Sequence, residues 1–203
     1  GEGLERPRLV HRLDRDTSGV LLLGKGPEAA KRLAGNFARR QAKKTYWAIV
    51  IGHPKPAAGQ IDLALKKSGI NDFEMMRPAD PKEHGAEPAE TAYVMLSRAA
   101  HRAAWMALRP FTGRTHQLRA HMAAIGHPIL GDPKYGDDKS RELSGLLKLQ
   151  LHARSIELEH PRGGVLKVVA PLSPEMKAGF AHFGFEPAEG DESDPFEGVR
   201  RMR

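Results

Sequence analysis

The pattern that most constrains the fold is a pair of strand-like segments in the middle of the chain, Thr91–Ser97 and Ala103–Leu108, which flank Arg98–Arg102. Apolar and aromatic residues predominate in both, and two strands this close together pair as an antiparallel hairpin. A second pair, Leu149–Leu158 and Val165–Val169, is joined by a short Pro/Gly-containing link. Because the remaining regular patterns are helices interspersed among such strands, the sequence indicates an α+β fold.

Helical spacing is clearest after Pro27, where Ala30, Leu33, Ala34 and Phe37 recur every three to four residues. The other face of this predicted helix is basic. The remaining predicted elements are strands Thr45–Ile51 and Ile61–Leu65, an irregular insertion over Lys66–Pro88, helix Thr115–Ile125, a loop over Gly126–Lys139 and helix Pro174–Phe183. The sequence shows no internal repeat and no second domain.

Length and composition exclude several classes of protein. A chain of 203 residues fits one domain with a sizeable core. It has no cysteine, which rules out disulfides, thiolate metal sites and a Cys nucleophile. There is no apolar run near the ~18 residues that a spanning helix needs. The start of the chain, Gly1–Arg8, does not have the apolar centre of a signal peptide, and the absence of cysteine is consistent with the cytoplasm.

Charge is distributed unevenly along the chain, whose formal net charge is +7. The segment Glu186–Gly198 holds six acids and no base, and three arginines follow it. Without residues 186–203 the body has 29 bases and 19 acids, a net charge of +10. A basic body favours a polyanion as partner, although solubility alone would also account for it. We expect a folded body over residues 1–185 and a disordered tail over residues 186–203.

One carboxylate lies in an unusual setting. Asp14 is flanked by Arg12 and Arg15, with no histidine near it at metal-ligand spacing. Opposite charge favours an ionised carboxylate, and a positioned carboxylate can act as a nucleophile. Guanidinium groups also bind phosphate well. An anionic nucleophile in cationic surroundings indicates chemistry on nucleic acid, although a capping or salt-bridged turn residue is the simpler alternative.

Three blocks, in this order, resemble the RluA family of RNA pseudouridine synthases. The first is His11-Arg-Leu-Asp-Arg-Asp-Thr-Ser-Gly19. The second, weaker alone, is Lys43-Lys-Thr-Tyr-Trp-Ala-Ile-Val50. The third is Gly113-Arg-Thr-His-Gln-Leu-Arg-Ala-His121, continuing through Gly126-His-Pro-Ile-Leu-Gly-Asp-Pro-Lys-Tyr-Gly136. The wording around Asp14 is similar to the RluC branch, which modifies large-subunit ribosomal RNA.

The resemblance implies a mixed, mostly antiparallel sheet with an active-site cleft running along it. It implies an isomerase that converts uridines of RNA to pseudouridine, with 23S ribosomal RNA or a large-subunit assembly intermediate as the expected substrate. The enzyme is expected to act as a cytoplasmic monomer without membrane association, metal or cofactor. Family members have further strands, and often a small RNA-binding S4 domain, before the first block. We therefore expect residues 1–185 to be a catalytic domain that lacks these upstream parts.

The resemblance also implies functions for individual residues. Asp14 would be the nucleophile, Arg119 would pair with its carboxylate, and Tyr46 would lie against the flipped uracil and remove the C5 proton. Arg12 would enter the space that the base vacates. Trp47, on the opposite face of the same strand, would be a core residue. The residues predicted to bind RNA are Arg12, Arg15, Lys44, Arg114 and His116.

Two other functions compete with this interpretation. A non-catalytic RNA-binding protein of ribosome assembly would have an equally basic body, but it would not need a carboxylate in a cationic groove. Asp14-Arg-Asp16 and Gly136-Asp-Asp138 imitate the motifs of haloacid dehalogenase-type phosphatases, but neither follows a buried apolar strand. The spacings of five and six residues between His116, His121 and His127 do not match the i, i+4 spacing of a helical metal site, so no metal is assigned.

Overall fold

A seven-stranded mixed sheet organises the structure, a computed structural model that describes residues 6–69, 75–100, 102–187 and 194–197. The strands follow the order β12-β11-β4-β10-β9-β5, and all neighbours in this path are antiparallel. The short β2 joins β11 in parallel. The bounds are β2 Ser18–Gly19, β4 Lys43–Ile51, β5 Ala58–Asp62, β9 Glu90–Ala99, β10 Ala103–Pro110, β11 Leu151–Glu159 and β12 Val165–Val169.

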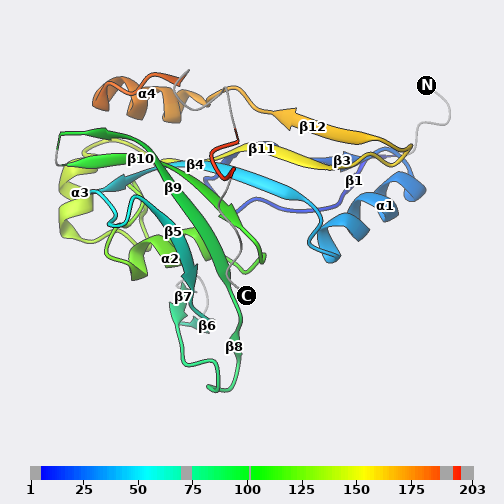
Figure 1. Ribbon diagram of the computed structural model, residues 1–203, viewed down its shortest axis with the longest axis horizontal. Helices are drawn as coiled ribbons and strands as arrows, with labels where there is room; N and C mark the ends of the chain where they lie inside the picture. Colours follow the sequence, from blue (N-terminus) through cyan, green and yellow to red (C-terminus); the bar gives the residue numbers. More distant parts are fainter. Residues whose placement is uncertain (1–5, 70–74, 101, 188–193, 198–203) are drawn as a thin grey trace.

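Helices and two small sheets surround this sheet (Figure 1). The helices are α1 Pro27–Ala38, α2 Gln117–Ala124, α3 Asp138–Ser144 and α4 Pro174–Phe183. The small sheets are β1 Arg8–Leu9 with β3 Leu23–Gly24, and β7 Met75–Pro78, β6 Leu65–Ser68 and β8 Ala86–Glu87 in that spatial order. Figure 1 shows α1, β1 and β3 at one end of the long axis and α3 near the other. No helix in the described ranges is long and apolar enough to cross a membrane.

The two faces of the sheet carry separate apolar cores, because successive residues of a strand point to opposite faces. On one face Trp47 packs edge-on against Trp105 and, at 6.0 Å, stacks with Phe180 of α4. The other face packs against α2 through Leu118 and Met122. Tyr46 lies on the α2 side and Trp47 on the α4 side, so the prediction that Trp47 is a core residue facing away from Tyr46 is confirmed.

The α+β class, the two antiparallel strand pairs and helix Pro174–Phe183 are confirmed. The insertion predicted to be irregular is partly ordered, because β6, β7 and β8 pair with one another across it. The predicted strand Ile61–Leu65 was wrong, since residues 63 and 64 separate β5 from β6. The predicted loop Gly126–Lys139 ends early, because the Asp137 side chain accepts a hydrogen bond from Ser140 N–H and caps α3.

The end of the chain also differs from expectation. Of the tail predicted to be disordered, residues 188–193 and 198–203 lie outside the described residues. Residues 194–197 form a turn on the body, and 5% of Phe196 is exposed because its ring joins the core on the α4 side. An aromatic side chain within an acidic segment is the local signal for this docking.

Candidate active site

Asp14 lies on a tight turn that leads into β2. The N–H of Thr17 donates to the carbonyl of Asp14 at 3.1 Å, and Asp16 has a left-handed φ of 69°, which aspartate tolerates better than most residues. After the turn, Gly19 has a φ of 114°, and a Cβ there would lie 2.2 Å from the carbonyl oxygen of Ala153. Glycine is therefore required where this turn meets β11.

Two histidines, His152 and His11, stabilise this turn through hydrogen bonds. Ser18 Oγ lies 2.8 Å from Nδ1 of His152, which is buried on β11. Nε2 of His11 accepts a hydrogen bond from Leu22 N–H at 2.8 Å, and its ring stacks on Phe37. Burial and the charge of Lys44 lower the pKa of His11, so the neutral ring that this bond requires is favoured. His11 is a packing residue of the turn.

A cavity of about 760 Å³ opens beside Asp14. Among the residues predicted for the site, those that line this cavity are Arg12, Asp14, Lys44, Tyr46 and Arg114. Those that do not line it are Arg15, His116 and Arg119. A volume of this size is within the range of pockets that hold small organic ligands, so one extruded nucleotide can be accommodated.

Tyr46 is placed in the cavity by β4. Burial, with the charge of Asp14 as a second cause, raises the pKa of Tyr46 to about 12. Asp14 and Tyr46 both line this cavity. A phenol with this pKa keeps its proton near neutral pH, so Tyr46 in the free protein offers a ring face and an O–H donor rather than a ready base.

Arg119 forms a bidentate ion pair with Asp132. Its Nε donates to one carboxylate oxygen at 2.7 Å and its Nη2 to the other at 2.6 Å, with both side chains buried. Burial lowers the pKa of Arg119, but its bonds to Asp132, the charge of Asp132 and the charge of Asp14 together raise it. The expected pairing with Asp14 is therefore corrected: the bonded carboxylate is Asp132, and Arg119 acts on Asp14 through space.

His116 ends the turn before α2 and explains why this helix begins at Gln117 rather than Thr115. Its left-handed φ of 50° cannot belong to the helix. Its Nδ1 lies 3.1 Å from the hydroxyl of Tyr135, which itself accepts a bond from Met76 N–H. Burial lowers the pKa of His116, with the charge of Arg119 acting in the same direction and Asp14 opposing it. His116 thus connects α2 to β7.

The remaining predicted cations differ in their freedom to meet RNA. Arg12 and Arg15 are exposed on the turn. Arg114 is half-buried and donates to Glu87 at 2.5 Å and to the Pro88 carbonyl at 3.1 Å. A phosphate at Arg114 would have to share it with Glu87, whereas Arg12 lies open at the cavity.

Sequence reasoning missed three residues that shape this site. Gln117 is buried and bonds Thr112 Oγ1 and the carbonyl of Glu90, which fixes the segment that leads into α2. Asp132 holds Arg119, and Arg109 of β10 lines the cavity. Gln117 and Asp132 stand inside the third recognised block, which could have indicated them. Arg109 precedes that block and gives no local signal.

In the described part of the chain, no group of three or more His, Asp or Glu side chains is gathered closely enough to hold a metal ion. The arrangement instead combines a half-buried carboxylate, an aromatic face and a buried cation beside a nucleotide-sized cavity. Such an arrangement suits covalent catalysis by a carboxylate on a nucleoside, which is the chemistry of an RNA base-modifying isomerase.

Comparison with known proteins agrees with this class. Residues 1–124 match the family described as RNA pseudouridylate synthase. The chain is 43% identical over 159 residues to the dual-specificity RNA pseudouridine synthase RluA of Salmonella typhi, covering 76% of this chain and 68% of that protein. It is 41% identical over 173 residues to the ribosomal large subunit pseudouridine synthase C of Pasteurella multocida, covering 83% of this chain and 52% of that protein.

The fold has a solved counterpart as well. The structure of human RNA pseudouridylate synthase domain containing 4 superimposes with a TM-score of 0.76 at 29% identity, covering 90% of this chain and 78% of the human one. The chain belongs to the RNA pseudouridylate synthase family and is a member of the RluA family within it. It is an RNA pseudouridine synthase, an isomerase.

Proposed function

We propose that this enzyme converts a uridine in structured RNA to pseudouridine with Asp14 as the nucleophile. The observation that carries the proposal is the position of Asp14 on the wall of a nucleotide-sized cavity that Tyr46 also lines. Attack on the ribose C1′ or the uracil C6 breaks the glycosidic bond and allows the base to rotate. Reattachment forms the bond between C5 and C1′, and the bond from Asp14 to C1′ or C6 breaks to regenerate the carboxylate. The C5 proton is released, and the former glycosidic nitrogen gains a proton.

The surrounding residues have separate functions in binding and orienting the substrate. The ring of Tyr46 stacks on the extruded uracil, and Arg119, held by Asp132, supplies a fixed positive charge to the site. Arg12 is exposed at the cavity and enters the stack that the base has left. Lys44 and Arg114 on the cavity wall, with Arg15 and His116 nearby, contact the RNA backbone.

We propose large-subunit ribosomal RNA as the substrate, acted on by a cytoplasmic monomer. The basic body, with a net charge of +10, fits a densely folded RNA, and the wording around Asp14 is similar to that of the large-subunit branch. A relative of dual specificity at 43% identity makes a second RNA class the competing substrate. RNA targets are chosen by loop shape and unstacked bases, so unmodified RNAs of both classes are the discriminating reagents.

The test is to incubate the protein with unmodified 23S rRNA and with unmodified tRNA, and to map pseudouridine by carbodiimide adducts and primer extension. Asp14→Asn should abolish modification while binding persists or tightens, because a negative charge has left a phosphate-binding groove. Asp16→Asn is the matched control, since Asp16 is an exposed neighbour whose left-handed φ asparagine tolerates. Turnover by the Asp14 variant equal to that of the Asp16 variant would refute the assignment.

A further inference from the structure

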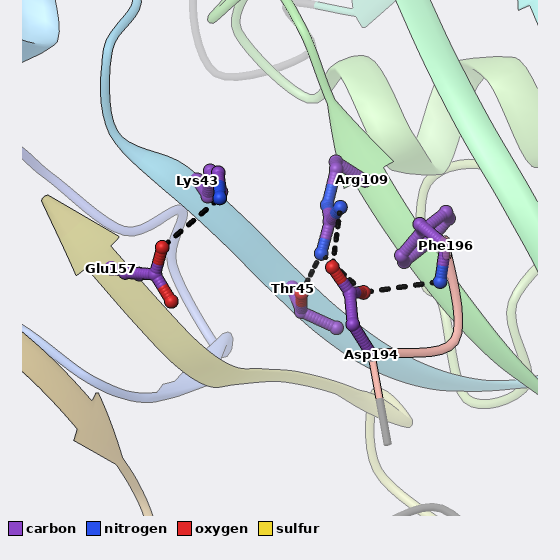
Figure 2. A network of polar contacts seen from close by, with 6 residues as sticks. All are labelled: Lys43, Thr45, Arg109, Glu157, Asp194 and Phe196. Carbon is purple, nitrogen blue, oxygen red and sulfur yellow. Dashed lines mark hydrogen bonds and ion pairs between the residues drawn. The ribbon is translucent and has the colours of Figure 1, made fainter. Parts of the chain in front are cut away.

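Arg109 lies where the tail meets the cavity (Figure 2). Its Nη2 donates to one oxygen of Asp194 at 2.8 Å and its Nη1 to the other at 3.2 Å. This paired geometry is the one that a guanidinium also presents to phosphate. The carboxylate of Asp194 is therefore positioned as a phosphate oxygen pair would be.

The body of the protein prepares Arg109 for an anion. Thr45 Oγ1 accepts from Nη2 at 3.1 Å and orients the group from β4, and the charge of Lys43 also acts on Asp194. Lys43 is itself paired with Glu157 at 3.0 Å (Figure 2). The Nε of Arg109 is buried with no hydrogen-bond partner among the described residues, so a donor remains unused.

The contact with the tail is a local turn, anchored by the Phe196 ring in the core on the α4 side of the sheet. Asp194 accepts from Phe196 N–H at 3.0 Å, and the Phe196 ring lies 4.2 Å from the Arg109 guanidinium carbon, which closes a small turn over it. The Asp194 side chain is 47% exposed, whereas that of Arg109 is 15% exposed. The cavity cations Arg114 and Lys43 are paired with carboxylates of the body, Glu87 and Glu157, whereas the carboxylate partner of Arg109 comes from the acidic end of the chain.

We propose that Arg109 is a phosphate-binding residue for the RNA strand at the cavity, and that Asp194 occupies it in the RNA-free protein and competes with the substrate. This inference rests on the proposed function for the identity of the polyanion. Displacement exchanges one anion for another at Arg109. The tail therefore lowers the affinity for an RNA that places no phosphate at Arg109. An RNA that places a phosphate there displaces the tail.

The experiment is equilibrium binding of a fluorescein-labelled RNA stem-loop, with one uridine in its loop, followed by anisotropy at low and high salt. Asp194→Asn should tighten binding about two- to fivefold at low salt, the range for a partly exposed ion pair, and the gain should shrink at high salt. Glu197→Gln removes the same charge from the same exposed turn without a described contact to Arg109, and it should leave affinity near the wild-type value.

Arg109→Gln completes the cycle. It should weaken binding, reduce the slope of log K against log salt by about 0.7 to 0.9, and abolish the effect of Asp194→Asn. The proposal is overturned if Asp194→Asn leaves RNA binding unchanged. It is equally overturned if the substitution weakens binding and lowers the Tm, since the tail would then only stabilise the fold. It is also overturned if the gain persists without Arg109, or if no variant binds the stem-loop.

Pseudouridine formation in the same stem-loop separates this inference from the proposed function. At saturating enzyme, Asp194→Asn should have the single-turnover rate of the wild type, because only binding is altered. Modification that proceeds while all variants bind equally would sink the phosphate site alone. The predicted binding differences without any pseudouridine would leave the Arg109 site standing and refute the proposed activity on this RNA.

Discussion

The substitution Asp132→Asn tests the contribution of the buried ion pair between Arg119 and Asp132. Only 4% of the Arg119 side chain and none of that of Asp132 is exposed. Removing one partner of a buried pair leaves an uncompensated charge and costs about 3 to 5 kcal/mol. Asparagine keeps an Oδ1 that can accept from the N–H groups of Lys134 and Tyr135, which Asp132 satisfies at 2.9 and 3.1 Å. The loss therefore reports mainly on Arg119.

For a chain of this length the loss corresponds to a fall in Tm of about 6 to 20 °C. Differential scanning calorimetry or urea unfolding measures it, with Glu28→Gln as a control that opens an exposed ion pair on α1 and should leave Tm unchanged. Arg119→Met with Asp132→Asn should be less unfavourable than the sum of the two single changes, because no buried charge is left alone. A Tm unchanged by Asp132→Asn, or strict additivity in the double variant, would refute the reasoning.

Four further outcomes follow from the same geometry. Arg119→Met should slow single-turnover modification about a hundredfold or more, the order expected for one preorganised charge, and a uniform loss of affinity at an unchanged rate would make it a phosphate contact only. Because the pKa of His11 is lowered in the folded protein, the unfolded chain binds more protons at this residue. The contribution of His11 to stability is therefore complete above about pH 6.5 and is lost as the pH falls through the folded pKa. Urea midpoints between pH 8 and pH 5 should show this loss, and His11→Gln should flatten the curve of stability against pH. Gly19→Ala should cost at least about 1 to 3 kcal/mol by urea unfolding, since a left-handed φ and the carbonyl of Ala153 both oppose a Cβ, and wild-type stability would show that β2 is not held as described. Arg12→Ala should slow modification of a hairpin more than of an unstructured strand of the same sequence at saturating enzyme, because only the hairpin must lose stacking; equal slowing would leave Arg12 an ordinary backbone contact.

Short-range patterns were read correctly wherever the determining contacts are local. Helix Pro174–Phe183 begins at a proline whose preceding Ser173 caps Met176 N–H, and both signals lie within one turn. The hairpin of β9 and β10 follows from two apolar segments and a short link. The enzyme family could also be predicted from the sequence, because the three motifs occur in the chain with the family's residues and in the family's order.

The prediction of an irregular insertion was partly wrong, and the turn over residues 194–197 was not predicted, because the contacts that order both segments are distant in the chain. β6 is stabilised by pairing with β7 and β8, and neither partner has a strong strand pattern of its own. The turn at Asp194 depends on Arg109, which lies 85 residues earlier in the chain. Charge composition indicated disorder for this segment, but it contains no information on which cation the folded body presents to it.

The sequence by itself determined the α+β class, the enzyme family and several of the residues that line the cavity, because these depend on periodicity and on the residues of the motifs. Only the tertiary structure decided how the charges are shared among them. In the structure Arg119 is paired with Asp132 rather than with Asp14, His11 is a packing residue, and Asp194 is bonded to Arg109. The physical reason is that an ion pair is selected by distance and burial, and both are set by the packing of elements far apart in the chain.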